Sequence, residues 1–277
     1  CNMKNKVKVE LNNIQNTLLI SLWSRAKETE MSNPIINDQT AYGLVKRLDY
    51  DFSVIEKNST LLKRLMFVVR AKTFDNAIKD FISKYPNSAI VNLGAGLDTT
   101  FFRVDNGKLN WYNIDLPDVI ELRKKLLPES NRERCIAKSF LDASWFNDIK
   151  KDYDNVFFLA GGLFAYYDEE NIKVFFNNLA KNFPNSEIIF DAPSSKSSNN
   201  RTNRAIKKYN LGNIELKLAI KNLKSLQRFS PYIEVKDYFG FFEKINRKKE
   251  WGILNNIQMT LNDLFHISNF YHLRFKN

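Results

Sequence analysis

The sequence predicts an α/β domain in which a largely parallel sheet is covered by helices on both faces. Apolar runs of strand length alternate with longer stretches in which apolar residues recur at helical spacing. One run, residues 89–93, is almost entirely apolar and is followed by glycine, which is typical of a strand buried on both faces of a parallel sheet. With 277 residues and 44% hydrophobic content, the chain can bury the core of one large domain.

Residues 1–85 are expected to form an N-terminal helical cap. In the first predicted helix, apolar residues recur at helical spacing from Leu11 to Leu22, and Arg25 continues this stripe. Arg25 is a candidate for an anion contact. A solvated charged turn over residues 25–28 is the more common explanation for such a run.

A second helix is predicted from Leu61 to Ile82. Arg70 falls on its apolar stripe, one turn from both Met66 and Phe74. Leaving a buried guanidinium unpaired costs several kcal/mol, so we expect Arg70 to meet an anion. That anion is either a protein carboxylate, in an internal salt bridge, or a bound ligand.

The strand at residues 89–93 leads into a loop that contains Gly94, Ala95 and Gly96. Glycines at this spacing let the backbone approach a ligand closely. A dinucleotide fingerprint has a third glycine, beneath the pyrophosphate, where this chain has Thr99. The loop therefore favours a cofactor without a pyrophosphate, such as S-adenosylmethionine, although an ordinary strand-to-helix turn has the same pattern.

A second strand, residues 111–115, ends in Asp115 about twenty residues after the glycine loop begins. A carboxylate at the tip of this neighbouring strand can accept hydrogen bonds from both hydroxyls of a ribose. Capping of the next helix, which opens at Pro117, is a compatible alternative. The basic residues 123–125 lie late in that helix and match its dipole.

Later segments complete the predicted sheet. Strands are expected near residues 157–160 and 187–191, with a helix after Asp168 between them. The polar segment 193–250 is expected to fold over the ligand as a lid that recognises the acceptor, because unstructured loops of this length are uncommon in compact domains. Residues 251–277 are expected to supply the closing strands.

Two segments, Val91–Arg103 and Trp111–Lys124, resemble the leucine carboxyl methyltransferase family. The best similarity is to its bacterial branch, which includes O-methyltransferases resembling those of polyketide biosynthesis. The resemblance implies a class I, Rossmann-like fold: a seven-stranded, mostly parallel sheet with helices on both faces, the helical cap, and an insertion after the fifth strand. It also implies a single methyltransferase domain over residues 1–277 with a cofactor-binding core at 86–192.

The same resemblance implies an S-adenosylmethionine-dependent O-methyltransferase that releases S-adenosylhomocysteine. Carried over by position, Gly94 and Gly96 line the methionine part of the cofactor, and Arg70 pairs with its carboxylate. Asp115 binds the ribose, and Asp142 binds the adenine amino group. The further residues expected at the cofactor are Arg25, Ala95, Asp98, Leu116, Leu141 and Gly161.

Gly161 marks a departure from the family pattern. Protein-methylating members carry a glutamate at the matching position after the fourth strand. The glycine therefore favours a small-molecule acceptor over the alternative, a protein C-terminal carboxyl group. From the sequence, Gly161 and Gly162 fit equally well as room for a bulky substrate and as a tight turn.

The acceptor is expected to be a small-molecule carboxylic acid or another oxygen nucleophile. The chain has only 2 histidines, both near its C-terminus, so no Ser-His-Asp or Cys-His arrangement can be proposed. A carboxylic acid with a pKa of about 4 is ionised at neutral pH and needs no base. A phenol needs one, and Tyr166, Tyr167 or a nearby acid are then the candidates. The catalytic residue is otherwise unassigned, with Tyr166 and Tyr167 as candidates for positioning the acceptor.

Composition limits the remaining possibilities. The net charge is +11, but the basic residues are spread along the chain, so no nucleic-acid partner is expected. An RNA-associated or non-catalytic protein with the same fold stays a distant alternative. Two cysteines exclude a cysteine-rich zinc site, and no metal is expected. We find no apolar run of membrane-spanning length and no secretion signal, so we expect a cytoplasmic protein without membrane association. The sequence leaves the oligomeric state open.

Overall fold

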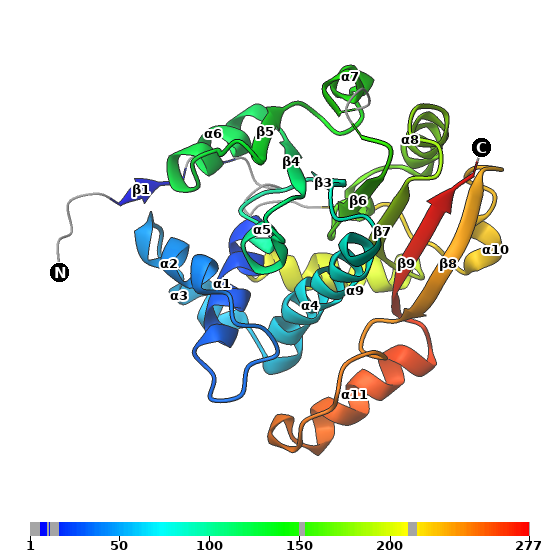
Figure 1. The fold of residues 1–277 in the computed structure, drawn as a ribbon. Coiled ribbons are helices and arrows are strands. Elements are labelled where there is room, and N and C mark those ends of the chain that lie inside the picture. The colour runs from blue at the N-terminus through cyan, green and yellow to red at the C-terminus, as the bar shows by residue number, and fades with distance from the viewer. Residues whose placement is uncertain (1–5, 10, 12–16, 150–152, 210–214, 277) are drawn as a thin grey trace.

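The computed structural model describes residues 6–9, 11, 17–149, 153–209 and 215–276. Its centre is a seven-stranded sheet with the strand order β5-β4-β3-β6-β7-β9-β8 (Figure 1). Only β9 runs antiparallel to its neighbours, so the predicted mostly parallel sheet is confirmed. The strands are β3 (Ala89–Leu93), β4 (Asn110–Asp115), β5 (Glu133–Ala137), β6 (Val156–Ala160), β7 (Glu187–Pro193), β8 (Ile233–Gly240) and β9 (Ser268–Phe275).

Helices cover both faces of this sheet, as Figure 1 shows. The longer ones are α1 (Thr17–Thr29), α2 (Gln39–Arg47), α4 (Leu61–Lys84), α6 (Pro117–Leu126), α8 (Glu169–Asn182), α9 (Lys196–Lys207) and α11 (Ile253–Leu264). The shorter ones are α3 (Ser53–Asn58), α5 (Thr100–Val104), α7 (Phe146–Ile149), α10 (Leu223–Leu226) and the 3₁₀ turns η1 (Ala143–Trp145), η2 (Phe164–Tyr166) and η3 (Lys249–Trp251). Two short strands, β1 (Val7–Lys8) and β2 (Leu48–Asp49), pair in parallel outside the main sheet.

The central strands are buried on both faces because successive side chains point to opposite sides of the sheet. In β3, Val91 packs in the cluster that includes α7 and α8, whereas Ile90 packs in the cluster that includes α4 and α5. A third cluster joins α1 and α2 to α6. The predicted helix at residues 61–82 is confirmed by α4; part of the earlier predicted helix lies outside the described residues, and α1 begins at Thr17.

The C-terminal third differs from the sequence expectation. Strand β8 lies inside the segment 193–250 that was assigned to the lid, and residues 253–264 form helix α11 instead of a strand. In β8, the half-buried Ile233 and Val235 alternate with the exposed Glu234 and Lys236. This is the period-two pattern of an edge strand with one solvated face, and the polar composition of the segment masked it. No helix in the described ranges has the length and apolarity needed to cross a membrane.

Candidate functional site

A cavity of about 840 Å³ lies at the carboxyl ends of the central strands. Residues 94–98 after β3, Asp115 at the end of β4, Gly161 after β6 and Asp191 in β7 all line it. Helices α1 and α4 close its sides, and Thr202 of α9 contributes to its wall. In open α/β sheets this edge is where ligands bind, and the volume suits a small organic molecule.

The two glycines of the loop after β3 have a backbone conformation that other residues rarely adopt. Gly94 has φ +62° and Gly96 has φ +51°. A Cβ atom at Gly94 would come within 2.7 Å of Leu163 Cδ1, and one at Gly96 within 3.2 Å of Leu18 Cβ. Both positions therefore need glycine for conformation and for space.

Two buried arginines hold the carbonyl groups of this loop. Arg123 Nη1 donates to Gly96 O at 3.1 Å and to Asp98 O at 2.7 Å, and Arg123 Nη2 donates to Glu133 at 2.8 Å. Arg25 Nη2 donates to Leu97 O at 3.0 Å. Three successive carbonyls thus have side-chain partners, so the loop shape is fixed from the protein side.

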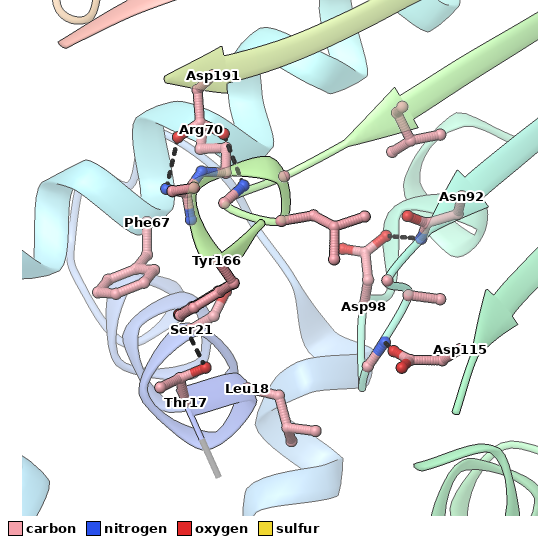
Figure 2. A pocket seen from close by; sticks show the side chains of 18 of the residues that line it. Thr17, Leu18, Ser21, Phe67, Arg70, Asn92, Asp98, Asp115, Tyr166 and Asp191 are labelled. Atoms are coloured by element: carbon pink, nitrogen blue, oxygen red, sulfur yellow. Dashed lines mark hydrogen bonds and ion pairs between the residues drawn. The ribbon is translucent and has the colours of Figure 1, made fainter. Parts of the chain in front are cut away.

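Asp115 connects the loop to the neighbouring strand. Its carboxylate accepts from Gly96 N at 2.7 Å and from Leu116 N at 2.8 Å, as Figure 2 shows for the first of these bonds. Burial raises the pKa of Asp115, although the two N–H bonds and Arg123 oppose that shift. Asp115 does not cap helix α6, whose N-cap position is taken by Leu116.

Asp98 and Leu116 also line the cavity. The Asp98 carboxylate accepts from Asn92 Nδ2 at 3.0 Å and from Thr100 Oγ1 at 3.0 Å, at the start of α5 (Figure 2). Leu116 exposes 37% of its surface at the pocket edge. Ala95, between the glycines, completes this wall.

Arg25 is buried, so the expected solvated turn is wrong for this side chain. Its guanidinium donates to Asp38 Oδ2 at 3.1 Å and to Ser21 Oγ at 2.7 Å, besides its bond to the glycine loop. Burial alone would raise the pKa of Asp38, but Arg25 and Arg103 hold it below its usual value. Arg25 lines the cavity, yet its guanidinium donates hydrogen bonds to groups of the protein itself. Contact with a bound anion therefore stays a prediction.

Arg70 faces the cavity from α4 and pairs with Asp191 of β7 (Figure 2). Arg70 Nη2 donates to Asp191 Oδ2 at 2.8 Å, and Asp191 Oδ1 accepts from Gly162 N at 2.8 Å. The internal salt bridge that the sequence allowed is present. Arg70 Nε is buried and has no hydrogen-bond partner among the described residues, so one donor of this guanidinium is not used by the protein. Contact between Arg70 and a ligand stays a prediction.

Gly161 and Gly162 lie directly against Arg70. A Cβ at Gly161 would meet Phe74 Cε2 at 2.8 Å and Arg70 Cδ at 3.1 Å, and one at Gly162 would meet Arg70 Nη1 at 3.1 Å. The space above these glycines therefore belongs to side chains of α4. The interpretation that they leave room for a bulky substrate is wrong for this space.

Tyr166 and Tyr167 both line the cavity. Tyr166 Oη donates to Thr17 Oγ1 at 3.3 Å, and burial raises the pKa of Tyr166 (Figure 2). Burial also raises the pKa of Tyr167, and the Asp115 carboxylate adds to that rise. A raised pKa keeps both phenols protonated at neutral pH, and a role for either tyrosine at the acceptor stays a prediction.

Leu141 and Asp142 are not among the residues that line the cavity in the described chain. The Asp142 carboxylate accepts from Ser144 N at 2.9 Å and caps η1, and Leu141 packs at the edge of the core. The wall next to them is formed by Lys138, Ser139 and Phe140. Their predicted contact with an adenine ring stays a prediction.

The sequence reasoning missed Asp191 and Arg123 as parts of the site. Asp191 was recognised only as a strand end, although the argument applied to Asp115, an acid at the tip of a buried strand, holds equally for it. Arg123 is 1% exposed, whereas the expectation grouped it with the exposed Lys124 and Lys125. The spacing of buried residues along α6 was the available signal.

Comparison with known proteins finds a matching protein family. The family model described as leucine carboxyl methyltransferase matches residues 19–180, more than half of the chain. The chain belongs to the leucine carboxyl methyltransferase family. It is an S-adenosylmethionine-dependent O-methyltransferase with the class I methyltransferase fold.

Two curated relatives are each 31% identical to this chain over the matched residues. One is the tetracenomycin polyketide synthesis O-methyltransferase TcmP of Streptomyces glaucescens, matched over 66% of this chain and 67% of that protein. The other is the S-adenosyl-L-methionine-dependent methyltransferase dpfgK of Gibberella zeae, matched over 69% of this chain and 70% of that protein.

Solved structures share the fold at low identity. A duf574 family protein from Streptomyces avermitilis aligns with a TM-score of 0.63 at 12% identity, covering 94% of this chain and 97% of that one. A putative methyltransferase from Thermobifida fusca aligns with a TM-score of 0.60 at 12% identity, covering 92% and 94%. The predicted fold class and family are therefore confirmed.

Proposed function

We propose that the cavity holds S-adenosylmethionine against the glycine loop and that the enzyme methylates a carboxylate of a small molecule. The loop supports this position for the cofactor because Gly94 and Gly96 line the cavity and place no side chain in it. Asp115 is the acceptor for the ribose hydroxyls. Arg70, with its partnerless Nε, is the cation for the cofactor carboxylate.

The observation that carries the choice of acceptor is that the acids on the described wall, Asp98, Asp115 and Asp191, each already accept hydrogen bonds from the protein. Among the described lining residues there is no histidine. His266 contacts Asn269 and His272 contacts Glu187, both outside the lining. The Asp191 carboxylate is engaged by Arg70 and Gly162 N, and both lining tyrosines are protonated. An acceptor that is already ionised fits this wall, and a carboxylate is ionised at neutral pH.

Apolar side chains support an acceptor with an apolar body. Met66, Phe67 and Phe74 of α4 line the cavity together with Phe241 after β8. TcmP, by its name, acts in polyketide synthesis. We therefore propose an aromatic or otherwise flat carboxylic acid as the substrate class. We also propose that the enzyme acts in the cytoplasm.

S-adenosylmethionine supplies a methyl group bound to a positively charged sulfur. The acceptor oxygen forms a bond to the methyl carbon with its own electron pair while the carbon–sulfur bond breaks, leaving a neutral ester and S-adenosylhomocysteine. The protein contributes alignment, because no proton has to be moved. The fixed glycine loop and Arg70 hold one reactant, and the apolar wall holds the other.

Methyl uptake from radiolabelled S-adenosylmethionine tests this proposal. Panels of apolar carboxylic acids, phenols of matched size and peptides with free C-termini are offered to the enzyme in parallel. We expect base-labile methyl esters on the small acids. Transfer only to phenols or only to peptide C-termini would contradict the proposed acceptor.

A further inference from the structure

Helix α11 presents an exposed apolar face. Among the described residues, six of the eleven large apolar side chains with high exposure belong to this helix or directly follow it, with exposures from 42% to 79%. They are Ile253, Leu254, Ile257, Leu261, Leu264 and Phe265. Concentration on one element marks an interaction surface, because exposed apolar residues are otherwise scattered singly. In Figure 1, α11 lies at the periphery of the domain.

The opposite side of α11 already holds the helix in place. Met259 is fully buried in the cluster beneath. The Asp263 carboxylate accepts from Phe242 N at 2.8 Å and from Arg247 Nη2 at 2.7 Å. The outer face is therefore not needed to attach the helix to its own domain, and it is presented on a firmly seated element.

The spacing of the outer residues suits another helix. Leu254, Ile257, Leu261 and Leu264 follow one another at intervals of three, four and three, which is the seam of a helix that packs along a second helix. We propose that this face is the contact between two copies of the chain, which pair their α11 helices in antiparallel orientation about a two-fold axis. The proposal is independent of the proposed function.

Charge identifies the second copy as the partner. The 12 residues of α11 contain one ionisable side chain, Asp263, in a chain of net charge +11. Of the basic residues just before the helix, Lys244, Arg247 and Lys248 pair with acids of the same chain, so an anionic membrane or an acidic protein would find little uncompensated positive charge besides Lys249. Two strongly basic copies, in contrast, approach most easily at an uncharged surface.

Antiparallel pairing also complements the helix ends. The first turn of α11 has no acidic residue and its last turn has no basic residue, so no side chain of the helix complements its dipole. Lys249 lies just before the helix, in η3. In the pair, Lys249 of one copy lies near the carbonyl end of α11 in the other, where a cation is favourable.

The area sets the expected strength. Burying a large apolar side chain removes roughly 60–120 Å² of apolar surface from water. The six partly exposed side chains of this face therefore give on the order of 400 Å² per copy. Two such faces approach the roughly 1,000 Å² in total at which specific interfaces begin. We therefore expect a dimer of modest affinity that dissociates on dilution.

Sedimentation velocity of the full chain over a range of concentrations tests the proposal. We expect a monomer–dimer equilibrium that the double variant Leu254→Glu/Leu261→Glu weakens by about a hundredfold or more. Val174→Glu is the matched control, since it places the same charge at an exposed apolar position of α8 and should leave dimerisation unchanged. Circular dichroism verifies that each variant is folded.

A second variant keeps the test decisive if the double variant fails to fold. Lys249→Glu should weaken the dimer several-fold, and Lys249→Arg should retain it. A wild-type chain that stays monomeric at all concentrations overturns the proposal, whether or not it binds anionic vesicles. A dimer that neither the double variant nor Lys249→Glu weakens overturns it as well.

Discussion

The two ends of the cavity, the glycine loop after β3 and the Arg70–Asp191 pair between α4 and β7, hold their polar groups in different ways. At the loop, side chains that are almost fully buried bind backbone carbonyls, and each of these arginines has a carboxylate partner of its own. At the other end, one guanidinium whose side chain is 19% exposed lines the cavity and pairs with the Asp191 carboxylate. The difference teaches that the first end fixes the shape of the loop, whereas the second leaves a charged side chain at the cavity wall, where we propose that it meets the cofactor carboxylate.

Removing Arg123 should give the largest loss of stability. Arg123→Met leaves Glu133 buried without its cation and strips the partners from two loop carbonyls. We expect the free energy of unfolding to fall by about 3–5 kcal/mol in urea denaturation. The control is Arg132→Met, whose exposed ion pair with Asp105 should contribute less than about 1 kcal/mol. Equal losses in both variants would contradict the role given to Arg123.

Removing Arg70 should act mainly on ligand binding. Arg70→Met removes the cation assigned to the cofactor carboxylate, so we expect affinity for S-adenosylhomocysteine to fall by about a hundredfold, measured by calorimetry. Stability should fall less than in Arg123→Met, because the Arg70 side chain is 19% exposed and Asp191 keeps its bond from Gly162 N. Unchanged affinity would contradict the assignment of Arg70 to the cofactor carboxylate and would leave Arg70 with a structural role alone.

Gly161→Ala tests the packing behind Arg70. The new methyl group meets the Phe74 ring and Arg70 Cδ, so we expect a loss of about 1–3 kcal/mol in thermal or urea unfolding. Gly43→Ala is the matched control, because it lies in helix α2 with nothing within 4 Å of the new Cβ. That substitution should be neutral or stabilise by up to about 1 kcal/mol.

The pH dependence of binding should follow Asp115. Burial raises the pKa of this carboxyl, so its charge is lost as pH falls while an ordinary carboxyl, with a pKa of about 4, is still ionised. Protonation removes the acceptor for the ribose hydroxyls. As pH falls, cofactor affinity should therefore begin to decline at a pH above the pKa of an ordinary carboxyl. Titration calorimetry at a series of pH values measures the decline, and Asp115→Asn should flatten it.

Much of the fold was predictable because it rests on local patterns. The apolar run of β3, the acid that ends β4 and the apolar stripe of α4 each reflect burial that the sequence records directly. Strand β8 was not predicted, because an edge strand with one solvated face contains as many polar residues as a loop.

The site was predictable where the backbone itself dictates a residue type. Gly94 and Gly96 are required by their positive φ angles and by close contacts. A loop with two glycines can be recognised from the sequence alone. The pairing of Arg70 with Asp191, or of Arg123 with Glu133, depends on which distant segments the sheet order brings together. Spacing along the chain carries no record of that order.

The most direct test of the central claim is calorimetric titration of S-adenosylhomocysteine into the wild-type chain and into Asp115→Leu, whose fold is verified by circular dichroism. We predict one binding site per chain in the wild type and an affinity at least about tenfold weaker in the variant, since the ribose hydroxyls lose a charged acceptor. Equal binding by both proteins would contradict the placement of the cofactor between the glycine loop and the end of β4.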